Sequence, residues 1–299
     1  MNILITGSSG LIGSNLSRSL AIKKHRILHL VRTKPTSEND IYWNPVSSDL
    51  DAESLEGVDA VVHLAGENIF GMRWTEEKKR KIRDSRIQGT RLLSEAVAGL
   101  KTPPSAFISA SAIGFYGDRG EERLTENSAP GRGFLSDVCR EWEKNTGAAE
   151  ARGIRVVHLR NGIVLSTRGG ALKKMLPVFR IGLGGKIGNG RQYMSWISLQ
   201  DLVGIIAFSI ENESLRGPVN AVSPNPVSNR VFSKTLGKVL SRPSWFTLPG
   251  FGARAAFGEM ADALLLSSTR VVPARLIDAG FRFRFESLEF ALNHALSAE

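Results

Sequence analysis

Short apolar runs rich in β-branched residues recur along the chain, and helix-length segments separate them. Glycine, proline and polar residues bound these runs, as is typical of strands; they lie at residues 2–6, 26–31, 60–65, 106–111, 155–160 and 217–224. The segments between them predict helices over residues 11–23, 76–98, 134–151 and 228–241. Strands that are apolar on both faces and alternate with helices indicate a parallel sheet covered on both sides. We therefore predict an α/β fold with a doubly wound parallel sheet.

The character of the sequence changes after Pro243. An aromatic loop comes first, and a helix, the run FRFRF and a last short helix follow it. We predict a main domain over residues 1–242. A smaller C-terminal segment over residues 243–299 is expected to pack on the side of the sheet where a substrate would bind.

The composition limits the classes of protein that the chain can represent. The 299 residues are 42% apolar and 23% charged, as in ordinary globular proteins. No apolar run approaches the length of a membrane span, so we expect no membrane partner. The single cysteine, Cys139, excludes an internal disulfide and fits a reducing compartment, which predicts a cytoplasmic protein.

A net charge of +10 favours a phosphate-bearing or nucleic-acid partner. The basic residues are scattered, however, and their densest run, residues 73–86, is interleaved with Glu76, Glu77 and Asp84 as on a solvated helix face. The sequence has no zinc-finger, RRM or KH signature, and its histidines show no metal-ligand spacing with Cys139. We expect a small-molecule substrate, no nucleic acid and no metal, and either a monomer or a homodimer.

A glycine-rich turn, TGSSGLIG, follows the first predicted strand and opens the first helix. Gly7 permits a tight turn, Gly10 lets the backbone approach a pyrophosphate, and Gly13 allows close packing of helix and strand. The amides at the helix N-terminus then face the phosphates. The context predicts a dinucleotide site formed by this turn, to which Ser9, Leu11 and Ile12 also belong.

The residue after the second predicted strand selects between the two nicotinamide dinucleotides. An acidic residue there accepts a hydrogen bond from the ribose 2′-hydroxyl of NAD(H), whereas an arginine accommodates the 2′-phosphate of NADP(H). The sequence reads LVRTK, with Arg32 at this position and Lys34 close behind. A guanidinium binds phosphate through forked hydrogen bonds. We predict NADP(H) as the cofactor; the alternative is a surface arginine without a ligand.

The glycine spacing TGxxGxxG resembles that of the extended, sugar-nucleotide-epimerase-like branch of the short-chain dehydrogenase/reductases. The segments HLAG, SRIQGT, ISASAIGFYG and WISLQDLV resemble further parts of that family, in the family's order. CREWE, GLGGKIGNG and the tail from GEMADALLL to RLIDAGF resemble an atypical, uncharacterised subgroup, some members of which are labelled cell-division inhibitors. The resemblance covers essentially the whole chain and implies an NAD(P)-binding Rossmann fold with a family-specific C-terminal segment.

The resemblance also implies which residues surround the cofactor. Beyond the glycine turn and Arg32, it assigns to the cofactor site Val31, Leu64, Ala65, Gly66, Lys81, Arg86, Ser109, Ile163 and Val164. Arg86 is expected to aim its positive charge at the site, and Ile163 and Val164 to lie near the nicotinamide. For Lys81 a position on a solvated helix face is the alternative.

In the extended family a serine acts together with a Tyr-x-x-x-Lys acid/base pair. The resemblance implies that Ser111 is this serine. Counted back from Glu143, the tyrosine and lysine positions hold Leu135 and Cys139, which cannot transfer a proton or supply a permanent positive charge. Tyr116, five residues beyond Ser111, is the candidate substitute acid, and a place in the turn or the substrate wall is its alternative.

Two more residues are candidates for contact with a substrate. Glu67 follows HLAG and could equally cap the next helix, and Arg160 ends a strand and could equally fix a loop. Three functional hypotheses remain open. The first is an NADP(H)-dependent oxidoreductase or epimerase acting on a carbonyl or sugar-nucleotide-like substrate, and the second is an NADP(H)-binding sensor or scaffold without turnover. The third is binding of a sugar nucleotide without redox change.

Overall fold

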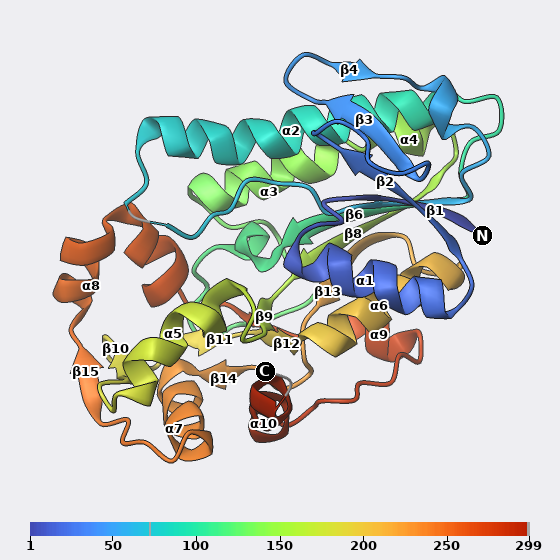
Figure 1. The fold of residues 1–299 in the computed structure, drawn as a ribbon. Coiled ribbons are helices and arrows are strands. Elements are labelled where there is room, and N and C mark those ends of the chain that lie inside the picture. Colours follow the sequence, from blue (N-terminus) through green and yellow to red (C-terminus); the bar gives the residue numbers. More distant parts are fainter. Residues whose placement is uncertain (72, 298–299) are drawn as a thin grey trace.

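The computed structural model describes residues 1–71 and 73–297. An eight-stranded sheet forms its centre (Figure 1), and the strands follow one another across it in the order β13 (Gly217–Ala221), β8 (Arg155–Asn161), β6 (Ala106–Ala112), β5 (Ala60–His63), β1 (Asn2–Thr6), β2 (Arg26–Val31), β3 (Asp40–Asn44) and β4 (Asp49–Leu50). All neighbours are parallel except β3 and β4. After β1 the chain adds β2, β3 and β4 in turn toward one edge of the sheet. It then crosses back, and β5 pairs with the opposite side of β1. This reversal makes the carboxyl ends of β1 and β5 the topological switch point of the sheet, where such folds bind their ligands.

Helices cover both faces of the sheet, as the sequence pattern predicts. One face carries α1 (Leu11–Ile22) and α6 (Leu199–Glu211), and the other carries α2 (Glu76–Ala98), α3 (Phe134–Lys144) and α4 (Gly147–Ala151) (Figure 1). Side chains alternate across a strand, so Ile3 and Ile5 of β1 join the core under α1 and α6, while Leu4 joins the core under α2. The doubly wound Rossmann architecture follows directly from strands that are apolar on both faces.

The six predicted strands are confirmed within a few residues, but the helix prediction over residues 134–151 is wrong in one respect. It is interrupted between α3 and α4, where the buried Thr146 hydroxyl bonds His158 Nε2 and the Glu143 carbonyl, both at 2.8 Å. The sequence analysis also missed α6. Nine of its thirteen residues are buried, so it lacks the polar face that gives a helix its sequence period.

A smaller lobe lies at the carboxyl side of the sheet. Short strand pairs build it, namely β9 (Ile163–Leu165) with β12 (Trp196–Ser198), β10 (Gly185–Ile187) with β15 (Phe246–Leu248), β11 (Tyr193–Met194) with β14 (Val227–Ser228), and β7 (Arg123–Leu124) with β16 (Arg270–Val271). The helices of the lobe are α5 (Gly170–Arg180), α7 (Asn229–Val239), α8 (Gly250–Phe257) and α10 (Leu288–Ser297), with a π-helical turn at Ala261–Leu266, whereas α9 (Ala274–Asp278) packs on β13 of the main sheet. Two 3₁₀ turns, Glu53–Leu55 and Ile113–Tyr116, lie in the main domain.

The C-terminal segment shares its hydrophobic core with residues that precede position 243. Leu176 of α5 and Phe232 of α7 pack in one cluster with Leu292 of α10. Much of the C-terminal segment is therefore one part of the lobe, to which residues 163–198 and 227–239 also contribute. Leu276 and Phe281 of the same segment pack instead in the core of the main domain. Among the described residues, none of the helices has the length and hydropathy needed to cross a lipid bilayer.

Candidate functional site

The turn between β1 and α1 requires glycine at two positions. Gly7 has φ +68°, and a Cβ atom there would lie 3.0 Å from the Ala65 amide nitrogen. A Cβ atom on Gly13 would lie 2.3 Å from the Gly7 carbonyl oxygen, well inside van der Waals contact. No side chain caps α1 at Gly10, so the amides of its first turn are left to bind an anion. The predicted roles of the glycines fit this geometry.

Thr6 fixes the loop after β5 against this turn. Its Oγ1 atom accepts hydrogen bonds from the amides of Leu64 and Ala65, both at 3.0 Å. A hydroxyl has one proton to donate, and the Thr6 proton goes to His63 Nδ1 at 2.8 Å. Burial lowers the pKa of His63 to about 4, so the ring stays neutral near pH 7. Leu64 and Ala65 thus reach the cofactor edge of the sheet through their backbone.

Arg32 lies at the same edge, directly after β2, and its side chain is exposed. No acidic residue occurs from Arg32 to Ser37, so a ribose hydroxyl would find no carboxylate there. The positive charge of Arg32 reaches the loop after β5, where it adds to stronger effects on Glu67. The hydrogen bond from Lys78 Nζ to Glu67 at 2.5 Å is the main reason why the pKa of Glu67 is lowered. Glu67 is therefore an ionised carboxylate surrounded by cationic side chains, and it is a poor proton donor.

Arg86 lies beneath the HLAG turn. One of its guanidinium nitrogens donates to the carbonyls of Glu67 and Ile82 at 3.0 and 2.9 Å. The group lies 4.9 Å from the centre of the Trp142 ring, and a Cβ atom on Gly66 would approach it to 3.4 Å. Arg86 therefore places its positive charge against the HLAG turn and holds the loop in place.

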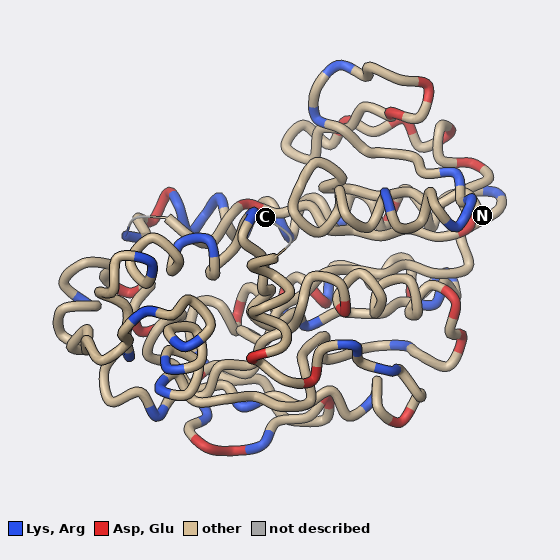
Figure 2. Tube along the Cα trace, turned by 60° about the horizontal axis from the view of Figure 1, so that its bottom comes forward, with Lys and Arg blue, Asp and Glu red and all other residues tan. Residues whose placement is uncertain are grey.

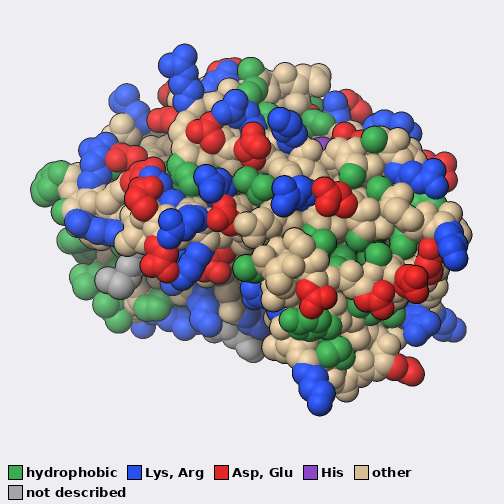
Figure 3. All heavy atoms as spheres, turned by 90° about the horizontal axis from the view of Figure 1, so that it is seen from above, with side chains coloured by type: hydrophobic (Ala, Val, Ile, Leu, Met, Phe, Trp, Pro, Cys, Tyr) green, Lys and Arg blue, Asp and Glu red, His purple; other side chains and the backbone are tan. Residues whose placement is uncertain are grey.

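Lys81 takes the alternative position, on the solvated face of α2. It is exposed and pairs with Glu77 at 2.6 Å, one helical turn earlier. Figure 3 shows Lys, Arg, Asp and Glu side chains intermixed on the upper face of the molecule. Lys78, on the same helix, is the lysine that reaches the loop after β5, and the sequence analysis did not single it out.

Ser111, Glu143, Arg160 and Tyr116 form one buried hydrogen-bonded chain. Ser111 Oγ donates to Glu143 Oε1 at 2.7 Å. Arg160 donates to both oxygens of Glu143 at 2.8 Å, and to the Tyr116 hydroxyl at 2.9 Å. The Tyr116 hydroxyl donates in turn to Asn220 Oδ1 at 2.6 Å. Each member of this chain therefore has a partner inside the protein.

This chain speaks against the roles predicted for Ser111, Tyr116 and Arg160. Their exposed fractions are 2%, 0% and 3%, so a substrate cannot reach them without a rearrangement of the core. Burial also raises the pKa of Tyr116, which makes the phenol a weaker acid than usual. The carboxylate of Glu143 raises the pKa of Arg160 despite its burial, and the pair ties α3 to β8. In this geometry all three side chains serve to hold α3, β6 and β8 together through hydrogen bonds.

Leu135 and Cys139 of α3 face the segment that leaves β6. A Cβ atom on Gly114 would lie 3.3 Å from Leu135 Cβ and 3.8 Å from Cys139 Sγ. The register counted from Glu143 thus agrees with the structure. Burial raises the pKa of Cys139 to about 12, so its thiol remains protonated and is no nucleophile. The two positions that carry the acid/base pair in the resembled family are apolar and uncharged here.

Ser9 is exposed and Leu11, Ile12 and Val31 are half-buried around the start of α1 and the end of β2. Three further predicted cofactor residues divide into two groups. Ile163 and Val164 follow β8 at the carboxyl edge and are half-buried. A Cβ atom on nearby Gly169 would lie 3.2 Å from Leu11 Cδ2, so this segment approaches the start of α1. Ser109, by contrast, is fully buried within β6, where its hydroxyl donates to the Ala110 carbonyl at 3.3 Å. No group of three His, Cys, Asp or Glu residues that could hold a metal occurs in residues 1–71 and 73–297.

Comparison with known proteins agrees with this geometry. The model of the NAD dependent epimerase/dehydratase family matches residues 3–221, and a domain of unknown function, DUF1731, matches residues 248–295. Epimerase family protein MT2273 of Mycobacterium tuberculosis is 45% identical over 293 residues, covering 98% of this chain and 97% of the relative. Epimerase family protein YfhF of Bacillus subtilis is 38% identical over 301 residues, with 99% and 98% covered. The crystal structure of human epimerase family protein SDR39U1 (isoform2) with NADPH has a TM-score of 0.91 at 32% identity, over 100% of both chains.

Proposed function

The chain belongs to the NAD-dependent epimerase/dehydratase family, and we propose that it binds NADP(H) at the turn between β1 and α1. The pyrophosphate would lie over the uncapped amides of α1, next to Gly7 and Gly13. Leu64 and Ala65, held by Thr6, would form one wall of the adenosine and ribose site. Ile163 and Val164 would lie toward the nicotinamide.

The preference for the 2′-phosphate is carried by a single observation. An exposed guanidinium, that of Arg32, follows β2 where a carboxylate would select NAD(H), and no acid occurs before Glu38. The crystal structure of the human relative with NADPH supports the same choice.

Calorimetric titration of the purified protein with NADPH and NADH tests the proposal. A charge-assisted, forked hydrogen bond to phosphate is worth roughly 1.5–3 kcal/mol, so NADPH should bind at least about tenfold more tightly. Equal affinities would remove the role given to Arg32, and absence of binding by both would remove the cofactor site.

Hydride transfer between the nicotinamide and a carbonyl or alcohol carbon of a small, sugar-nucleotide-like substrate is the leading activity within this proposal. Family membership supports it. The proton that accompanies the hydride would come from solvent or from the substrate, because Leu135 and Cys139 offer no titrating group near pH 7. Glu67, ionised beside Lys78, is available to contact a substrate only as an anion.

A non-catalytic NADP(H)-binding sensor or scaffold is the second candidate. The observation in its favour is the combination of an apolar pair on α3 with a buried Ser111 and Tyr116. Such a protein would respond to the cofactor without converting a substrate.

Deuterium transfer separates the two candidates. NADPH labelled with deuterium on either face of nicotinamide C4 is incubated with the protein and a panel of carbonyl compounds, including nucleotide-linked 4-keto sugars. Mass spectrometry then detects label in the alcohol product. Enzyme-dependent label supports the oxidoreductase, whereas tight NADPH binding without any label across the panel supports the sensor.

A further inference from the structure

The positive charge of the chain is concentrated in residues 151–258, which comprise β8, α6 and β13 of the main domain and much of the smaller lobe. Residues 151–200 contain nine Lys or Arg and no Asp or Glu. Residues 214–258 contain six Lys or Arg and likewise no Asp or Glu. Outside residues 151–258 the chain has 24 basic and 26 acidic residues, so this stretch holds the entire positive excess. Figure 2 shows where these charges fall along the fold. The densest basic run, residues 73–86, has seven basic and three acidic residues, and acidic residues elsewhere outside residues 151–258 offset its remaining charge.

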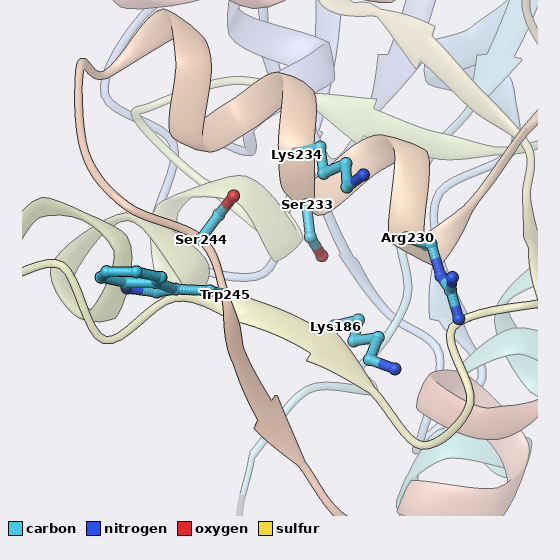
Figure 4. A pocket seen from close by; sticks show the side chains of 6 residues that line it. All are labelled: Lys186, Arg230, Ser233, Lys234, Ser244 and Trp245. Atoms are coloured by element: carbon cyan, nitrogen blue, oxygen red, sulfur yellow. The ribbon is translucent and has the colours of Figure 1, made fainter.

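Within this lobe, a cavity of about 160 Å³ opens between α7, β10 and the segment before β15. Its lining consists of three cationic residues, two serines and a tryptophan, namely Lys186, Arg230, Lys234, Ser233, Ser244 and Trp245. No carboxylate lines it. Figure 4 shows the charged ends of the three cationic side chains on one side, the Ser233 hydroxyl pointing toward the space between them, and Trp245 extending at the other end.

Two glycines allow the walls of this cavity to come together. A Cβ atom on Gly190, where φ is +71°, would lie 3.1 Å from both Arg230 Cβ and Lys186 Cδ. The aliphatic parts of the Arg230 and Lys186 side chains therefore both pack against Gly190. On the opposite wall, a Cβ atom on Gly237 would lie 2.6 Å from Ser244 Cβ, so the segment that carries Trp245 packs directly on α7.

Cations held close together without a counterion repel one another, and a bound anion removes this repulsion. A guanidinium offers forked donors to phosphate oxygens, and Ser244 adds a hydroxyl, whereas Ser233 Oγ already donates to the Gly185 carbonyl at 3.0 Å and can only accept. The Trp245 side chain is 84% exposed at the rim, so its ring has a free face. We propose that this cavity binds a phosphate group between Lys186, Arg230 and Lys234, with an apolar or aromatic part of the same ligand against Trp245.

The proposed site is separate from the cofactor site. It lies on α7, β10 and the segment before β15, and it shares no residue with the turn between β1 and α1 or with the loops after β2 and β5. Two sources of ligand have the required chemistry, a soluble phosphorylated compound and the headgroup of an anionic lipid. Ile181, Leu183 and Phe246, all more than half exposed in the same lobe, would suit the second source.

A double variant, Arg230→Ser with Lys234→Ser, tests the proposal, because both side chains are exposed and their removal should leave the fold intact. Lys173→Ser with Lys174→Ser is the matched control, since these exposed lysines of α5 belong to the same acid-free stretch but do not line the cavity. Binding of pyrophosphate and of ADP is measured by calorimetry with saturating NADPH present, so that neither probe enters the glycine turn. Sedimentation with vesicles of phosphatidylglycerol and phosphatidylcholine forms the second arm.

The expected result is that at least one arm shows binding that the Arg230/Lys234 variant weakens about tenfold or more, while the Lys173/Lys174 control stays within about twofold of wild type. Binding of soluble probes alone identifies a soluble ligand, and binding to anionic vesicles alone identifies a lipid headgroup. Trp245→Ala should weaken ADP or vesicle binding and leave pyrophosphate binding unchanged. Absence of binding in both arms, or equal loss in both double variants, would overturn the proposal.

Discussion

Thr6 illustrates how much of the candidate site depends on one side chain. Its hydroxyl accepts from two backbone amides of the loop after β5 and donates to a buried, neutral histidine. The partners lie 57 to 59 positions away in the sequence. Replacing Thr6 would therefore loosen the wall of the cofactor site without touching the cofactor.

Thr6→Val should lower the free energy of unfolding by about 1–3 kcal/mol, because the change removes the partner of the buried His63 Nδ1 atom and of the part-buried Ala65 amide. Thr6→Ser keeps the hydroxyl and is the matched control, with a much smaller loss. Urea unfolding followed by circular dichroism measures both. A valine variant as stable as the serine variant would show that the hydrogen bonds contribute nothing.

Glu126 provides a prediction on pH dependence. Burial raises its pKa above the ordinary value of 4.5, and its Oε2 atom is among the buried atoms without a hydrogen-bond partner in the described part of the chain. The folded state therefore keeps a proton that the unfolded state releases above about pH 4.5. The stability that this proton supplies is fully present below that pH and is lost as pH rises through the folded-state pKa.

Glu126→Gln, which cannot ionise, should melt at an increasingly higher temperature than wild type as pH is raised from about 4.5 to 7. Thermal unfolding of both proteins at matched pH values measures the difference. Glu121→Gln, at an exposed position nearby, is the control for the removal of a carboxylate. A constant offset between Glu126→Gln and wild type at every pH would mean that Glu126 titrates normally.

The sequence predicts residues well where one local pattern decides their role. The glycines of the first turn and Arg32 after β2 stand at fixed distances from a strand end, so their positions could be read from the sequence. Ser111 and Tyr116 could not, because strand register and packing decide whether a hydroxyl points to a site or into the core. The Glu143 and Arg160 side chains meet through folding of α3 onto β8, and no spacing rule anticipates their pairing.

At the scale of elements, α3 is held to the sheet by a buried ion pair in place of the catalytic pair that its family position suggests. Glu143 and Arg160 bond through both carboxylate oxygens, with exposed side-chain fractions of 11% and 4%. Leu135 and Cys139 pack on the segment after β6 from the same helix. α3 therefore has a clear structural role whether or not the protein catalyses a reaction.

Glu143→Gln and Arg160→Met should each lower the free energy of unfolding by roughly 3–5 kcal/mol, because each leaves one buried charge without its partner. The double variant should lose clearly less than the two single losses combined, since it leaves neither charge behind. Arg140→Ala removes an exposed cation from the same helix and should change stability little. Strictly additive losses in chemical denaturation would contradict the pairing.

Strands of the main sheet could be predicted at this scale because they are apolar on both faces and bounded by turn residues. The short pairs of the smaller lobe could not, since two or three residues give no period. The helix α6 was missed because it is apolar on nearly all sides, and α5 carries a proline, Pro177, that argues against a helix.

The whole molecule combines a nearly neutral Rossmann domain with a strongly basic lobe. The carboxyl ends of β1 and β5 hold the proposed cofactor site, and the cavity beside α7 holds the proposed phosphate site. The excess of basic over acidic residues in residues 151–258 is visible in the sequence, but which of these residues line a common cavity is decided by the fold.

The choice of NADP(H) is the central claim, and Arg32 tests it most directly. Arg32→Ala should weaken NADPH binding about 10- to 100-fold and leave NADH binding within about twofold, because only NADPH presents a 2′-phosphate to the guanidinium. Arg26→Ala, at the opposite end of β2 and equally exposed, should change neither affinity. Calorimetric titration of the three proteins with both cofactors is the measurement. Equal losses for NADPH and NADH in Arg32→Ala, or no loss for either, would contradict the account.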